Sequence, residues 1–112
     1  MSTNLHTELD KLFALEKGWQ DGDAGKPVTE EARERSEKVL RAMYAVNNPA
    51  DSVFPNEDGG IRFYWSKSED KLTVDIDPDG SVSLHRINMP SGFQYLAFVD
   101  ESELRWHFKV TA

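Results

Sequence analysis

The chain has 112 residues, no cysteine and a formal net charge of −7, because 20 acidic side chains outnumber 13 basic ones. Without cysteine it forms no disulfide, no thiolate metal site and no cysteine nucleophile, a composition that suits the reducing cytoplasm. The acidic balance argues against a role that depends on attraction to nucleic-acid phosphates or to anionic lipid.

Length and hydropathy indicate one domain without a membrane segment. A chain of this size buries roughly 65% of its unfolded surface and folds without cross-links. No apolar stretch approaches the roughly 18 residues that span a membrane. The first residues also lack the basic start and the apolar run of a signal peptide. We therefore expect one α+β domain over residues 1–112, located in the cytoplasm and free of membrane contact.

Two helices are predicted in the first half of the chain. Over residues 4–17, leucines and a phenylalanine recur at spacings of three and four, and Gly18 follows as a residue that commonly ends a helix. Over residues 29–46, Thr29 can cap a helix whose first turn is acidic, as the helix dipole favours. A second apolar stripe runs along this helix until the Asn-Asn-Pro sequence that ends it.

The segment between these helices, residues 18–27, holds three glycines, a tryptophan and two aspartates. We interpret Trp19 as filling the space between the helices, and Asp21 and Asp23 as acceptors for backbone N–H groups. The Asp-x-Asp spacing also begins a calcium-binding EF-hand loop. However, the position that should supply its last carboxylate, counted from Asp21, is Ala32. The sequence therefore predicts a structural loop without a metal.

After Pro55 the hydrophobic period changes from 3.6 to 2, which predicts strands joined by short turns. Five strands are expected, over residues 61–66, 71–76, 81–87, 93–99 and 103–110. Residues 100–106 admit a second interpretation, a short helix capped by the acidic residues at its start. The strict alternation through Val110 favours the strand.

Consecutive strands with short turns form an antiparallel meander. The two preceding helices should cover one face of it, which gives a two-layer α+β fold. In this arrangement Trp65 and Trp106 share the helix-facing side of the sheet and are expected to be buried. The opposite side of the sheet is predicted to face solvent.

That solvent-facing side is the predicted binding surface. The strand windows contain two acids, Asp75 and Glu103, while basic and aromatic residues are frequent in them. Tyrosine, phenylalanine and arginine are the residue types favoured at protein interfaces. The predicted partner-binding residues are Arg62, Tyr64, His85, Leu96, Phe98, Arg105 and His107.

Two other interpretations of this face stay open at the sequence level. Leu96 and Phe98 could pack beneath a loop or a chain terminus as ordinary surface residues. Single-stranded nucleic acid could stack on the sheet, but the sequence lacks the glycine-and-aromatic signature of such sheets and places acids at the edges. The composition therefore favours another protein as the partner and argues against nucleic acid.

Patterns for catalysis or metal binding are weak. The three histidines, His6, His85 and His107, lack the spacing of a zinc site and the order of a catalytic triad. Most acidic pairs fall in predicted turns, and solvent-exposed positions of this kind do not suit general acid–base catalysis. We predict a protein that is not an enzyme and uses no cofactor. The alternative is a small hydrolase or transferase whose acids meet His85 or His107 in a cleft.

Two segments resemble parts of small uncharacterised bacterial and phage proteins. They are residues 15–29, LEKGWQDGDAGKPVT, and residues 55–61, PNEDGGI. Such proteins have a Gly-Trp-Asp-Gly-rich loop, a proline-capped helix and an Asp-Gly-Gly entry into a strand. Gln20 departs from the pattern, which has aspartate there. The resemblance implies a helix–helix–sheet fold and a bacterial or mobile-element origin.

A chain of this size, charge and resemblance is expected, by analogy, to be an inhibitor, an antitoxin or an immunity-type protein. A second hypothesis comes from the charge of the helices. Their acidic residues could mimic nucleic acid and occupy a basic groove on the partner.

Overall fold

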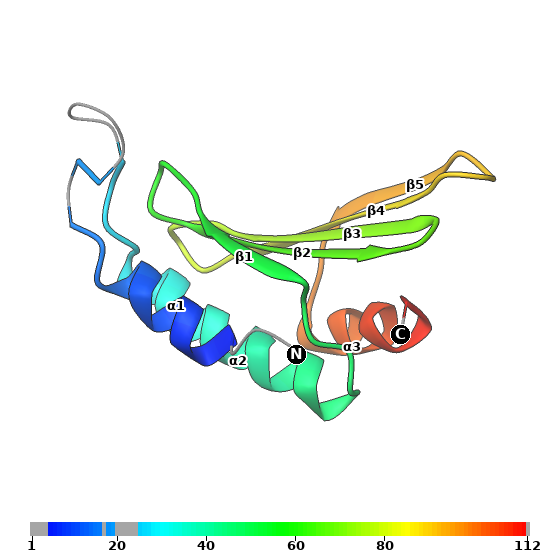
Figure 1. Cartoon of the computed structure of the whole chain (residues 1–112), viewed down its shortest axis with the longest axis horizontal. Helices are drawn as coiled ribbons and strands as arrows, with labels where there is room; N and C mark the ends of the chain where they lie inside the picture. The colour runs from blue at the N-terminus through cyan, green and yellow to red at the C-terminus, as the bar shows by residue number, and fades with distance from the viewer. Residues whose placement is uncertain (1–4, 17, 20–24, 112) are drawn as a thin grey trace.

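The computed structural model describes residues 5–16, 18–19 and 25–111, and in this part of the chain three helices pack on one face of a five-stranded antiparallel sheet (Figure 1). The helices are α1 (Leu5–Phe13), α2 (Glu30–Ala45) and α3 (Glu101–Thr111). The strands are β1 (Ser52–Pro55), β2 (Ile61–Lys67), β3 (Asp70–Ile76), β4 (Val82–Asn88) and β5 (Phe93–Phe98). They pair in chain order, so the sheet is a simple meander as expected.

Helix α2 is fixed to the sheet through its N-cap residue, Thr29. The Thr29 side chain accepts a hydrogen bond from the Ala32 N–H at 3.1 Å, as an N-cap residue does. Its hydroxyl donates to the Pro78 carbonyl at 2.6 Å, and the Thr29 N–H donates to the Gly59 carbonyl at 3.1 Å. The helix start is therefore bonded to two turns of the sheet.

The predicted strand over residues 103–110 is wrong, because this segment is helix α3. Asp100 caps the helix, since its Oδ1 accepts a hydrogen bond from the Glu103 N–H at 2.9 Å. The buried positions Leu104, His107 and Phe108 follow helical spacing. An alternating segment with residues at these spacings fits either periodicity, and the Asp100 cap together with the packing of Phe108 against Trp65 favours the helix.

Strand β1 completes the sheet in place of that segment. It was not predicted because it has four residues, Ser-Val-Phe-Pro, and contains a proline, which usually argues against a strand. In the sheet it is an edge strand, a position that tolerates proline.

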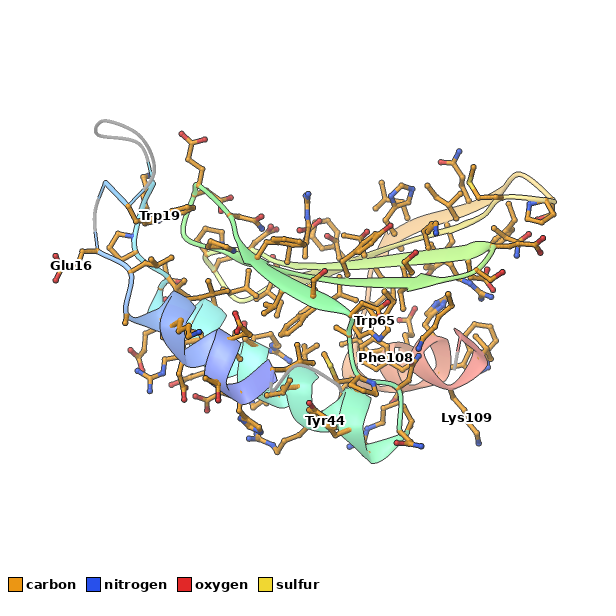
Figure 2. All side chains as sticks on the ribbon, in the orientation of Figure 1. Glu16, Trp19, Tyr44, Trp65, Phe108 and Lys109 are labelled. Carbon is orange, nitrogen blue, oxygen red and sulfur yellow. The ribbon has the colours of Figure 1, made fainter. Side chains whose placement is uncertain are left out.

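The core lies between the sheet and the helices, and Trp65 and Phe108 belong to the part of it beside α3 (Figure 2). Trp65 is fully buried, as predicted. The prediction for Trp106 is wrong, since this side chain is 58% exposed on α3. The helix turns Phe108 inward and Trp106 outward, whereas a strand would have placed both on one face.

Candidate functional site

The sheet face turned away from the helices is not covered by any helix of the described part of the chain (Figure 1). Side chains of alternate positions in each strand form this surface, which we call the outer face. Its residues are Ser52, Phe54, Arg62, Tyr64, Ser66, Lys71, Thr73, Asp75, Ser83, His85, Ile87, Gln94, Leu96 and Phe98.

Five of the seven predicted partner-binding residues lie together on the outer face. Tyr64, His85 and Leu96 belong to one cross-strand row that runs Ser52, Tyr64, Thr73, His85, Leu96. Arg62 and Phe98 belong to the neighbouring row, Phe54, Arg62, Asp75, Ser83, Phe98. Strand pairing therefore brings predicted residues from three strands, β2, β4 and β5, onto one surface.

Arg105 and His107 are not part of this surface, so their predicted position on the outer face of the sheet is wrong. Both lie on α3, which packs on the other side of the sheet, and His107 is buried there. The error follows directly from the strand predicted over residues 103–110.

The exposed apolar side chains of the outer face lie on the two edge strands, β1 and β5. Leu96 and Phe98 on β5 are each 71% exposed, and Phe54 on β1 is 49% exposed. Exposed apolar side chains gathered in this way mark interaction surfaces more often than isolated ones do. Phe54 was missed in the sequence because β1 was not predicted.

The middle of the outer face is polar and internally paired. Arg62 Nε donates to Asp75 Oδ1 at 2.7 Å and Arg62 Nη2 donates to Asp75 Oδ2 at 3.3 Å. These hydrogen bonds to Asp75 are the main cause that raises the pKa of Arg62. Lys71 Nζ donates to Ser66 Oγ at 2.6 Å. The face is thus less basic than the sequence indicated, since Arg86, Arg105 and Lys109 lie elsewhere.

A shallow hollow lies at the β1 end of the outer face. It has a volume of about 480 Å³ and is lined by Phe54, Pro55, Asn56, Arg62, Tyr64 and Thr73. We call it the β1 hollow. It combines two aromatic rings with a guanidinium that Asp75 holds in place, so its polar group is already ordered before any partner binds.

A second concavity lies on the helix side, between the β4–β5 hairpin and α3. This α3 cleft, of about 340 Å³, is lined by Arg86, Phe93, Tyr95, Glu103, Trp106 and His107. The His107 ring contacts Tyr95 at a centroid distance of 5.0 Å and meets Trp106 edge-on at 4.8 Å. The sequence did not point to it because it is built on the helix α3.

The titratable groups of the α3 cleft influence one another. Burial first, and the charge of Arg86 second, lower the pKa of His107, while Glu103 acts in the opposite direction. Burial also raises the pKa of Tyr95, whose hydroxyl donates to Glu103 Oε2 at 3.4 Å. Of the two histidines in the enzyme hypothesis, His107 does meet an acid in a cleft, whereas His85 lies on the outer face.

The glycine-rich loop closes on itself. Trp19 Nε1 donates to the Lys26 carbonyl at 2.7 Å, and the Gly18 N–H donates to the Gly25 carbonyl at 2.7 Å. Trp19 is not among the side chains that pack against the core, so the prediction that it fills the space between the helices is wrong. Asp21 and Asp23 lie outside the described residues.

In residues 5–16, 18–19 and 25–111, no group of three or more histidine, aspartate or glutamate side chains is arranged to hold a metal ion. Within the same part of the chain, no helix combines the length and the apolar character that crossing a bilayer requires.

Comparison with known proteins gives no assignment. No protein-family model matches the sequence, and no curated protein or solved structure is significantly similar to it. The resemblance to bacterial and phage proteins therefore stays a prediction.

Proposed function

We propose that the chain acts by binding another protein, without catalysis, and that its partner docks on the outer face at the β1 hollow. The observation that carries the proposal is the set of side chains in that hollow. Tyr64 and Arg62 belong to the residue types that dominate binding energy at protein interfaces, and Phe54 belongs to a type that is enriched there.

The distribution of charge supports the outer face over the helices as the interface. Helix α2 has four acidic and four basic residues, so it is balanced rather than acidic. Some of these charges pair with each other, as Arg33 does with Glu37 at 3.6 Å. A mimic of nucleic acid needs a row of unbalanced negative charge, and α2 does not present one. The charge of α2 therefore supports the nucleic-acid-mimic hypothesis less than the net charge of the whole chain does.

Within this proposal, we infer that the bound partner is inhibited, as expected for an inhibitor, an antitoxin or an immunity-type protein. The inference rests on the small size, the acidic charge and the resemblance to bacterial and phage proteins.

Partner capture followed by quantitative binding tests the proposal. The wild-type chain is used as bait in a bacterial lysate, the retained protein is identified by mass spectrometry, and its affinity is measured with purified components. The variant Phe54→Ser with Tyr64→Ala should weaken binding by about 2 kcal/mol or more, roughly thirtyfold, because it removes both aromatic side chains of the hollow.

The matched control is Glu34→Lys with Glu37→Lys on α2, which should leave the affinity within about threefold of wild type. If the α2 variant abolishes binding and the hollow variant retains it, the helices are the interface and the nucleic-acid mimic becomes the better hypothesis. Inhibition is tested separately, by titrating the chain into an assay of the captured partner's own activity.

A further inference from the structure

The two edges of the sheet differ in how well they are protected from pairing with another strand. β1 has four residues and includes Pro55, and both features discourage the addition of a strand. β5 has six residues, Phe-Gln-Tyr-Leu-Ala-Phe, with no charge, no proline and no glycine. Natural proteins usually protect an edge strand with charged residues or proline. An edge strand of this length without them is suited to pairing with another strand.

The hydrogen-bond pattern shows which backbone groups of β5 point away from the sheet. The Val99 N–H donates to the Val82 carbonyl at 3.0 Å, and this pair of residues follows Ser83 and Phe98, the last pair of the β4–β5 ladder. Hydrogen-bonded pairs alternate along an antiparallel ladder. The odd-numbered residues of β5 therefore bond to β4, and the N–H and C=O groups of Gln94, Leu96 and Phe98 point outward.

These outward groups are available for a further strand. Apart from the β4–β5 ladder, no backbone hydrogen bond joins Gln94, Leu96 or Phe98 to another described residue. The side chains of Leu96 and Phe98 are each 71% exposed on the outer face beside them. The edge thus offers both a free hydrogen-bonding row and an apolar strip.

We propose that β5 pairs antiparallel with β5 of a second copy of this chain, across a two-fold axis at Leu96. The three outward residues are spaced symmetrically about Leu96, so the edge is complementary to itself. Leu96 lies opposite Leu96 of the second copy, and Gln94 lies opposite its Phe98. Every outward N–H and C=O group of the three residues then has a partner, and the two sheets become one continuous sheet.

The charge distribution favours this arrangement between two copies of an acidic chain. Each copy carries a formal charge of −7, which opposes association wherever acidic surfaces meet. The run from Phe93 to Val99 has no charged side chain, so pairing at this edge brings no like charges directly opposite each other. It also joins Leu96 and Phe98 of both copies into one apolar cluster on the outer face.

The oligomeric state in solution tests this proposal. Sedimentation velocity on the purified chain, at concentrations up to about 1 mM, should show a species of twice the 12.8 kDa chain mass. Leu96→Lys places two like charges opposite each other on the axis and should raise the dimer dissociation constant at least tenfold. Gln94→Pro removes an outward N–H without touching the bonds to β4 and should have the same effect.

Tyr44→Lys is the matched control, because it adds the same charge at an exposed aromatic position of α2, on the side of the molecule away from the sheet (Figure 2). It should leave the dimer intact. Circular dichroism and thermal melting establish whether each variant is folded. If Leu96→Lys does not fold, Gln94→Pro provides the test of the β5 edge. A wild-type chain that stays monomeric overturns the proposal, as does a dimer that both β5 variants leave intact. Neither result bears on partner binding at the β1 hollow, which lies at the opposite edge.

Discussion

The Trp65 and Phe108 rings lie 4.8 Å apart between centroids, at the point where α3 meets the sheet (Figure 2). Both side chains are fully buried. Trp65 lies in the middle of β2 and Phe108 in the last turn of α3. The contact therefore joins two residues that are 43 residues apart in the sequence. It is one of the contacts that hold the C-terminal helix on the sheet.

Removing the Phe108 ring should therefore destabilise the whole domain. Phe108→Ala leaves a cavity against Trp65 and is expected to lower the free energy of unfolding by about 3–5 kcal/mol. Urea denaturation followed by circular dichroism measures the change. Val110→Ala, at a half-exposed position of the same helix, is the control and should cost about 0.5 kcal/mol or less. Equal effects of the two changes would mean that α3 is not docked through Phe108.

A hydrogen-bond bridge through Asn48 holds the same junction. Trp65 Nε1 donates to the Asn48 carbonyl at 2.9 Å, and Asn48 Nδ2 donates to the Phe108 carbonyl at 2.8 Å. That carbonyl lies in the last turn of α3, where no partner is available within the helix. Asn48→Ala should lower the free energy of unfolding by about 1–3 kcal/mol, because a buried carbonyl loses its donor.

Comparison with the exposed neighbour Asn47 is unsuitable, since its φ of 56° is itself a constraint. The better control is Ala45→Ser, an exposed change one turn earlier, which should be nearly neutral in the same urea titration. If Asn48→Ala is equally neutral, the bridge contributes nothing measurable to stability.

Much of the fold follows from local patterns in the sequence. The residues of β2, β3 and β4 alternate, the turns before and after β4 contain proline and glycine, and α2 has both a cap and an apolar stripe. Local signals of this kind are sufficient because each neighbouring pair of strands is also consecutive in the chain.

The C-terminal segment and β1 could not be predicted from such patterns. The positions of Leu104, Trp106 and Phe108 satisfy both a period of 2 and, in part, a helical period, so tertiary contacts with Trp65 select the helix. For the site, alternation was enough to place Arg62, Tyr64 and Leu96 on one face. The ion pair that ties Arg62 to Asp75 depends on strand register, which the sequence leaves open.

Tryptophan exposure distinguishes the helix from the predicted strand over residues 103–110. Trp106 is 58% exposed on α3, whereas a strand would bury it. Trp106→Phe should therefore remove a large part of the fluorescence that acrylamide quenches readily, leaving mainly that of the partly exposed Trp19, and should change the free energy of unfolding by about 1 kcal/mol or less. The matched change Trp65→Phe should leave the quenchable fraction in place. A strongly destabilised Trp106→Phe variant would support the strand instead.

The glycine-rich loop offers a test of coupling between two residues. Gly25 has a φ of +94°, and a Cβ there would lie 2.8 Å from the Trp19 ring. Gly25→Ala should therefore lower the free energy of unfolding by about 1–2 kcal/mol, through backbone strain and through the clash. In the Trp19→Ala background the same change should cost less, because the clash is gone while the strain remains. Additive effects of the two changes in thermal melting would show that the ring does not pack on Gly25.

The lowered pKa of His107 makes a component of stability depend on pH. Burial in the α3 cleft is the larger cause and the Arg86 charge the second, with Glu103 opposing both. In the unfolded chain the group has its ordinary pKa of about 6.5, so below that pH the unfolded state binds a proton that the folded state does not. The contribution is therefore fully present above about pH 6.5 and is lost as the pH falls from there toward the lowered folded pKa.

Urea denaturation from about pH 7.5 to pH 5, for wild type and His107→Gln, measures this component. The free energy of unfolding of wild type should fall more steeply over this range than that of the variant, whatever the difference in their stabilities at pH 7.5. The slope is the informative quantity, because glutamine at this position also changes packing against Tyr95 and the loss of packing is the same at every pH. Carboxyl groups titrate in both proteins and cancel in the comparison. Parallel curves for the two proteins would show that His107 takes up a proton as readily when folded as when unfolded, and the α3 cleft would then not be the desolvated environment described above.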